Sequence, residues 1–103
     1  MKLWIDDVRP APEGYVWCES VDKTKDYIIF NDFELLNGCS EIELISLDHD
    51  AGDYYGYGGD YIRLLEWLEE TGRNYPIKIH SQNPDGVENM RRIIQRNNWK
   101  EVL

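Results

Sequence analysis

The strongest constraint on the fold of this chain is a seven-residue stretch in which a short apolar run stops abruptly at charged side chains. Residues 44–47 are mostly apolar, and Asp48, His49 and Asp50 follow them directly. A short apolar run is typical of a buried strand. Because charged groups are costly to bury without partners, we expect these three side chains where the strand leaves the core.

Two other apolar segments end in the same way. Residues 3–5 and residues 77–79 each run into polar side chains, which are Asp6, Asp7, Arg9, His80 and Ser81. In open α/β sheets, ligands bind at the carboxyl ends of the strands. If these strands are parallel neighbours, their polar ends meet at one edge, and the sequence predicts a site there.

Helical patterns lie between the predicted strands. Ser20 is a suitable N-cap for a helix that buries Val21, Thr24 and Ile28, and Asn37-Gly38 closes this helical region. A second helix starts at Asp60 and ends at Gly72, with an apolar stripe of Tyr61, Leu64, Leu65 and Leu68. Asn83 as N-cap and Pro84 at the first helical position open a third helix, with an inner face of Val87, Met90 and Ile94.

The alternation of strands and helices predicts one small α/β domain over residues 1–103, with a mostly parallel sheet flanked by helices. We expect strands near residues 2–6, 15–18, 43–48 and 76–80, in the spatial order second, first, third, fourth. Pro10, Pro12 and Gly14 break any helix between the first two strands. A parallel crossover normally takes a dozen or more residues, so this link is either irregular and extended, or the second strand is not parallel.

Composition excludes several classes of function. The net charge of −9 argues against an extended nucleic-acid surface, although it leaves room for a nucleotide in a local pocket. No apolar run approaches the roughly 20 residues that cross a bilayer, and the N-terminus lacks a signal-peptide pattern, so a cytoplasmic location is expected. Cys18 and Cys39 match no metal-binding spacing and are interpreted as free thiols.

The acidic residues at the predicted edge have two interpretations. Asp6, Asp7 and Asp48 together would repel one another unless a cation joins them, and hard oxygen ligands on an open edge suit Mg²⁺. The alternative is that they are solvated turn residues. Arg9 could clamp a phosphate in a bidentate manner, or form a salt bridge with one of these aspartates.

Both histidines of the chain follow predicted buried strands. His49 and His80 could exchange protons near neutral pH, one as general base and the other as general acid. Asp50 or Asp48 could orient an imidazole, as the acidic member of a catalytic triad does. The alternative is that each histidine is a hydrogen-bonded structural residue.

Two further segments flank the predicted site. Ser81 and Asn83 lead into a helix N-terminus, which favours phosphate binding, and Gly86 would allow a close approach to the backbone. The alternative is an ordinary capped helix. Residues 53–59 form a loop rich in tyrosine and glycine, which is either a lid or stacking surface for a base, or a mobile loop whose tyrosines pack on neighbouring helices.

Taken together, three motifs resemble the cyclic-phosphate-processing receiver-like domains, relatives of response-regulator receiver domains. The motifs are Asp6-Asp7-x-Arg9-Pro10, Leu47-Asp48-His49-Asp50, and His80-Ser81-x-Asn83-Pro84-x-Gly86 with Asn89-Met90. The resemblance implies a Rossmann-like sheet of the receiver or flavodoxin type and processing of cyclic phosphates in RNA repair. In receivers the acidic pair binds Mg²⁺, a role that Asp6 and Asp7 resemble, and Asp48 resembles the phosphoacceptor.

The chain departs from true receivers at several positions. His80-Ser81 stands where receivers carry a hydroxyl residue, no strand-ending lysine follows, and the first helix is reduced or absent. The leading hypothesis is therefore a phosphodiesterase that acts on a 2′,3′-cyclic nucleotide or RNA end, with His49 and His80 as acid and base. The alternatives are a non-catalytic module that binds a nucleotide, or a degenerate receiver that binds another protein.

Overall fold

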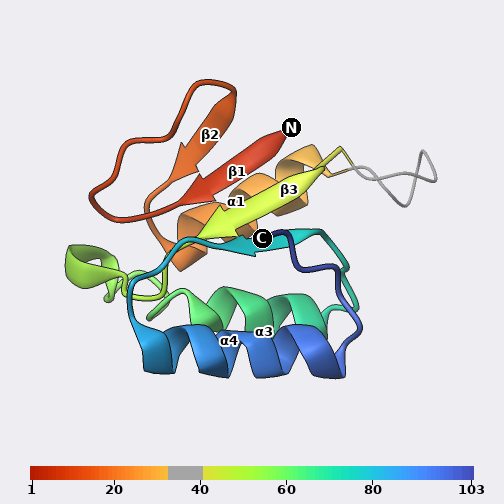
Figure 1. Cartoon of the computed structure of the whole chain (residues 1–103). Coiled ribbons are helices and arrows are strands. Elements are labelled where there is room, and N and C mark those ends of the chain that lie inside the picture. Colours follow the sequence, from red (N-terminus) through yellow and green to blue (C-terminus); the bar gives the residue numbers. More distant parts are fainter. Residues whose placement is uncertain (33–40) are drawn as a thin grey trace.

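The computed structural model describes residues 1–32 and 41–103. Four parallel strands form one sheet in the spatial order β2-β1-β3-β4, as predicted (Figure 1). Their bounds are β1 Lys2–Ile5, β2 Tyr15–Cys18, β3 Leu44–Leu47 and β4 Ile77–Ile79. The chain thus has the predicted α/β fold of the receiver or flavodoxin type.

Three helices, α1 (Val21–Asn31), α3 (Ile62–Glu70) and α4 (Pro84–Arg96), accompany the sheet. The Ser20 side chain accepts the Lys23 N–H at 3.1 Å, which confirms the predicted N-cap. The helix ends at Asn31, and the closing signal at 37–38 lies outside the described residues. No helix in the described ranges is long and apolar enough to cross a membrane.

The second predicted helix begins later than the sequence pattern indicates. α3 starts at Ile62 and not at Asp60, because the Asp60 carboxylate turns back to accept the Ala51 N–H at 3.0 Å. Its apolar stripe is buried as predicted. Gly72 follows the helix with φ of 68°, a conformation that favours glycine.

One hydrophobic core lies on one face of the sheet. The buried side chains of the three helices and of Leu3, Ile5, Ile45 and Leu47 belong to a single cluster. Each of the links β2-α1-β3 and β3-α3-β4 moves in the same direction across the sheet, so right-handed crossovers place their helices on the same face. Met90 and Ile94 of α4 are buried as expected, but Val87 is only half-buried.

The short link between the first two strands is irregular and extended, and β2 is parallel to β1. Two indole groups hold it. Trp4 Nε1 donates to the Arg9 carbonyl at 2.9 Å, and Trp17 Nε1 donates to the Asp6 carbonyl at 2.8 Å. Side-chain donors thus replace the helix that would otherwise order this connection.

Candidate functional site at the carboxyl edge of the sheet

The carboxyl ends of β1, β3 and β4 bring the predicted polar residues together. The strand ladders continue one residue past each strand, since the Asp48 N–H donates to the Ile5 carbonyl at 3.0 Å and the His80 N–H donates to the Leu47 carbonyl at 2.9 Å. Asp6, Asp48 and His80 therefore leave three neighbouring strands at one edge, as predicted.

Asp6, Asp7 and Asp48 form an acidic cluster in which one carboxylate oxygen of each lies within 4.8 Å of the others. Asp6 is fully buried, and Asp48 is nearly so. This cluster resembles the metal site of receiver domains. Its hard oxygen ligands fit a small divalent cation.

Asp6 is the most constrained carboxylate of the acidic cluster. Burial acts to raise its pKa, but hydrogen bonds from the Arg9 and Val8 N–H groups and from His80 outweigh it, so the pKa of Asp6 lies below its ordinary value. The two backbone bonds to Oδ1 measure 2.9 Å and 3.0 Å. Asp6 is therefore ionised at neutral pH and holds the start of the link to β2.

Asp7 lacks comparable support. Its pKa is raised by burial and by the neighbouring charges of Asp6 and Asp48. A Cβ atom at Gly52 would overlap Asp7 Oδ2, so the glycine makes room for this carboxylate. A nearby cation would stabilise the ionised form of a carboxylate that lies this close to two others.

His80 is enclosed by protein groups, with a side chain only 11% exposed. Its Nδ1 lies 2.8 Å from Ser46 Oγ, its Nε2 lies 2.9 Å from Asp6 Oδ2, and its ring stacks on Trp4 with centroids 3.8 Å apart. Burial lowers the pKa of His80, although the Asp6 carboxylate opposes this shift. Both ring nitrogens are thus occupied within the fold.

The lowered pKa of His80 predicts a pH dependence of stability. The unfolded chain takes up a proton near pH 6.5, whereas the folded chain resists protonation until a lower pH. The free energy of unfolding should therefore be highest above about pH 6.5 and fall as the pH drops toward the folded pKa. Urea titrations from pH 7.5 to 5 in EDTA should show this slope in the wild type, and His80→Gln should largely remove it; an equal slope in both would contradict the assignment.

His49 has a different environment. Its Nδ1 lies 2.8 Å from Asp50 Oδ1, and its ring packs on the Gly86 backbone so closely that a Cβ there would overlap it. Among the described residues, no hydrogen-bond partner of Nε2 is found. The exposed Asp50 carboxylate thus orients an imidazole whose second nitrogen is available, and Asp60 lies near enough to complete a second acidic group with them.

Arg9 joins the acidic cluster to the end of β4. Its Nη1 donates to the His80 carbonyl at 2.9 Å, and its Nε lies 3.9 Å from Asp6 Oδ2. The side chain is 42% exposed, so part of the guanidinium faces solvent. This placement shows the ion pair predicted for Arg9, and the bidentate binding of a phosphate stays a prediction.

Most hydrogen bonds at the N-terminus of α4 are those of an ordinary helix cap. Asn83 Oδ1 accepts the Gly86 N–H at 3.1 Å, and Ser81 Oγ accepts the Asn83 N–H at 3.1 Å. The Val87 N–H donates to the Asn83 carbonyl. Asn83 Nδ2 lies 3.4 Å from both Asp50 oxygens, which links this turn to His49. Gly86 therefore lies against His49, Asn83 reaches its partner Asp50, and Ser81 is bonded within the turn.

The tyrosine-rich loop after β3 is held by several hydrogen bonds and contains a 3₁₀ turn, η1 (Gly52–Tyr54). The Asp22 N–H of α1 donates to the Tyr57 carbonyl at 3.0 Å, and the Gly59 N–H donates to the Tyr55 carbonyl at 2.8 Å. Tyr55 and Tyr57 are exposed. The structure thus presents two exposed tyrosines on a hydrogen-bonded loop.

The comparisons with known proteins agree with this arrangement. Residues 1–96 match the family described as the cyclic-phosphate processing receiver domain. The chain belongs to this family. No curated protein and no solved structure that was compared with the chain matches it.

Three residues of this receiver domain at the site were missed by the sequence analysis. Ser46 supports His80 from β3, while Trp4 and Trp17 hold the link that carries Asp6 and Arg9. Ser46 carried a signal, because it is the polar residue within an apolar strand. The tryptophans carried no such sequence signal, because tryptophan is common in buried strands and the acceptor of its indole N–H depends on the fold.

Proposed function

We propose that this receiver domain hydrolyses the cyclic phosphate of a 2′,3′-cyclic nucleotide or of an RNA end. The single observation that carries the proposal is the His49 imidazole, which Asp50 orients through Nδ1 while Nε2 has no hydrogen-bond partner among the described residues. An oriented imidazole with one open nitrogen is the arrangement that general acid–base catalysis requires. The family description supports the substrate class.

In the proposed reaction, water attacks the phosphorus atom and one ester bond to a ribose oxygen breaks, leaving a phosphomonoester. His49 Nε2 takes the proton from the attacking water. The exposed part of the Arg9 guanidinium and the Ser81–Gly86 turn hold phosphate oxygens, where charge develops. The departing ribose oxygen takes a proton either from a second acid or from the imidazolium that the first step forms.

His80 was expected to supply that second acid, and its contacts favour another role. Both of its ring nitrogens have protein partners, so proton transfer to a substrate would break the bond to Asp6 or to Ser46. We propose that His80 chiefly holds Asp6 in place. A direct proton-transfer role for His80 is the competing assignment, and the variants in the Discussion separate the two.

Asp6, Asp7 and Asp48 are proposed to hold Mg²⁺ or a similar cation. The raised pKa of Asp7 fits this proposal, because a bound cation would offset both the burial and the repulsion from Asp6 and Asp48 that raise it. Such a cation would reduce the repulsion between the acidic cluster and an anionic substrate. Arg9 neutralises only part of the cluster, since its guanidinium lies beside Asp6.

Gly52→Ala should weaken cation binding on the order of tenfold, because the added Cβ displaces the Asp7 carboxylate and strains a residue at φ of 53°. Titration with Mg²⁺ or Mn²⁺ by calorimetry and thermal shift measures the effect. Gly56→Ala is the matched control in the same loop, since its Cβ would meet no atom within 4 Å. Equal affinities in both variants would remove Asp7 from the ligand set, and no response of the wild type at millimolar cation would mean that Arg9 alone neutralises the cluster.

The function itself is tested with 2′,3′-cyclic and 3′,5′-cyclic nucleotides, by following the phosphomonoester product. We expect turnover of the 2′,3′-cyclic substrates. Binding of cyclic nucleotides without turnover would instead support a non-catalytic binding module. If cyclic nucleotides are neither cleaved nor bound, and the protein gains mass after treatment with acetyl phosphate and Mg²⁺, the chain is a phosphoaccepting receiver.

A further inference from the structure

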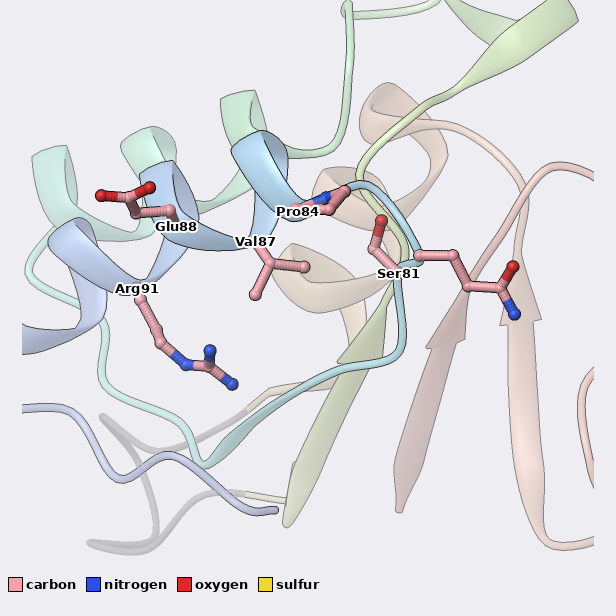
Figure 2. A pocket seen from close by; sticks show the side chains of 6 residues that line it. Ser81, Pro84, Val87, Glu88 and Arg91 are labelled. Carbon is pink, nitrogen blue, oxygen red and sulfur yellow. The ribbon is translucent and has the colours of Figure 1, made fainter.

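A groove of about 340 Å³ lies beside α4, outside the cluster of catalytic groups described above (Figure 2). It is lined by Ser81, Gln82, Pro84, Val87, Glu88 and Arg91. Its volume is at the lower end of the range of small-molecule sites, which is about 300 to 1,000 Å³. We infer that this groove holds the nucleobase of the substrate, an inference that rests on the proposed function and names the part of the substrate that the enzyme recognises.

The groove adjoins the proposed phosphate site through residues that are neighbours in the chain. Ser81 follows His80 in the chain, and the His80 carbonyl is the group that accepts the Arg9 guanidinium at 2.9 Å. On the other flank, Gly86 packs under the His49 ring, and the next residue, Val87, lines the groove. A ligand whose phosphate lies between Arg9 and His49 can therefore extend past the first turn of α4 into the groove.

The charges in the groove exclude a second phosphate and favour an uncharged ligand. The Arg91 guanidinium Nε lies 2.7 Å from Glu101 Oε2, and the Glu88 carboxylate accepts the Arg92 guanidinium at 2.8 Å. Each charged group in the lining is thus paired with an opposite charge. A polyphosphate or a free cation would find no unbalanced charge there, whereas a neutral ring with polar edges fits.

The remaining groove surface offers an apolar wall for the ring face of a nucleobase and polar groups for its edge. Pro84 and Val87 supply an apolar wall from the first turns of α4, and Figure 2 shows Val87 pointing into the space between the helix and the segment that carries Ser81. The Gln82 carboxamide is exposed and offers both a donor and an acceptor. Arg91 is bonded through Nε, so its outer nitrogens can donate to a base edge.

The test compares adenosine 2′,3′-cyclic phosphate with glycerol 1,2-cyclic phosphate, which has the same five-membered cyclic phosphate and no base. The wild type should favour the adenosine substrate in kcat/KM. Gln82→Ala, Val87→Asp and Arg91→Ala should each lower this preference about tenfold or more, the usual size of the contacts to one base. Arg96→Ala is the matched control, because Arg96 is exposed on the same helix and pairs with Glu69 of α3, which does not line the groove.

The outcomes separate this inference from the proposed function. Equal kcat/KM for both substrates in the wild type would overturn the groove assignment and leave the hydrolase intact. Loss of the preference in Tyr55→Ala or Tyr57→Ala, with the groove variants unchanged, would place the base on the tyrosine loop and overturn it as well. If neither substrate is cleaved, calorimetry with adenosine 3′-monophosphate decides: weaker binding in Val87→Asp than in Arg96→Ala supports the groove, and equal binding overturns it.

Discussion

His49→Ala should lose at least two decades of turnover on a 2′,3′-cyclic nucleotide while it still folds and binds the phosphate. The physical reason is that His49 transfers a proton in the transition state and does not stabilise charge that the bound substrate already carries. A general acid–base step typically raises the rate by about 10²- to 10⁴-fold. Steady-state kinetics with product binding by calorimetry measure both effects.

The matched variant for His49→Ala is His80→Gln. If His80 positions Asp6, His80→Gln should lower cation affinity and stability, and turnover should recover in part at saturating cation. If His80 is itself the second acid, turnover should fall by two decades with cation affinity intact, and the two-histidine mechanism is then correct. Near wild-type turnover in His49→Ala would remove His49 from the mechanism altogether.

Asp6→Ala should be the most destabilising change at the site, by about 3 kcal/mol, because each buried donor left without its acceptor typically costs about 1 to 3 kcal/mol. The substitution leaves the Val8 and Arg9 N–H groups and the His80 ring without their shared acceptor. Urea denaturation in EDTA at pH 7 measures the loss without interference from bound cations. Asp6→Asn keeps a side-chain oxygen for the backbone bonds and should lose less than half as much.

The loss of stability in Asp6→Asn should depend on pH. Because the pKa of Asp6 is lowered in the folded chain, its contribution to stability is full above the unfolded value near 3.9 and is lost as the pH falls toward the folded pKa. The difference in unfolding free energy between wild type and Asp6→Asn should therefore shrink below about pH 4. A difference that stays constant down to pH 3 would show that the Asp6 charge contributes nothing.

The sequence by itself determined the element types, the strand order and the edge at which the polar residues gather. These features depend on local patterns, since a short apolar run, a capping serine or asparagine and a helical stripe each act within a few residues. Parallel strands then place Asp6, Asp48 and His80 at one edge without further information. The family resemblance rested on the same strand ends and was confirmed over residues 1–96.

Only the tertiary structure decided how each polar side chain is used. The two histidines look alike in the sequence, since each follows a buried strand, yet His80 turns inward while His49 keeps one nitrogen available. The partners of His80 are Ser46 and Asp6, which are 34 and 74 residues away in the chain, and no local pattern specifies contacts over such separations. Side-chain packing across three strands therefore gave the His80 ring a protein partner at both nitrogens, whereas the described residues pair the His49 ring at only one.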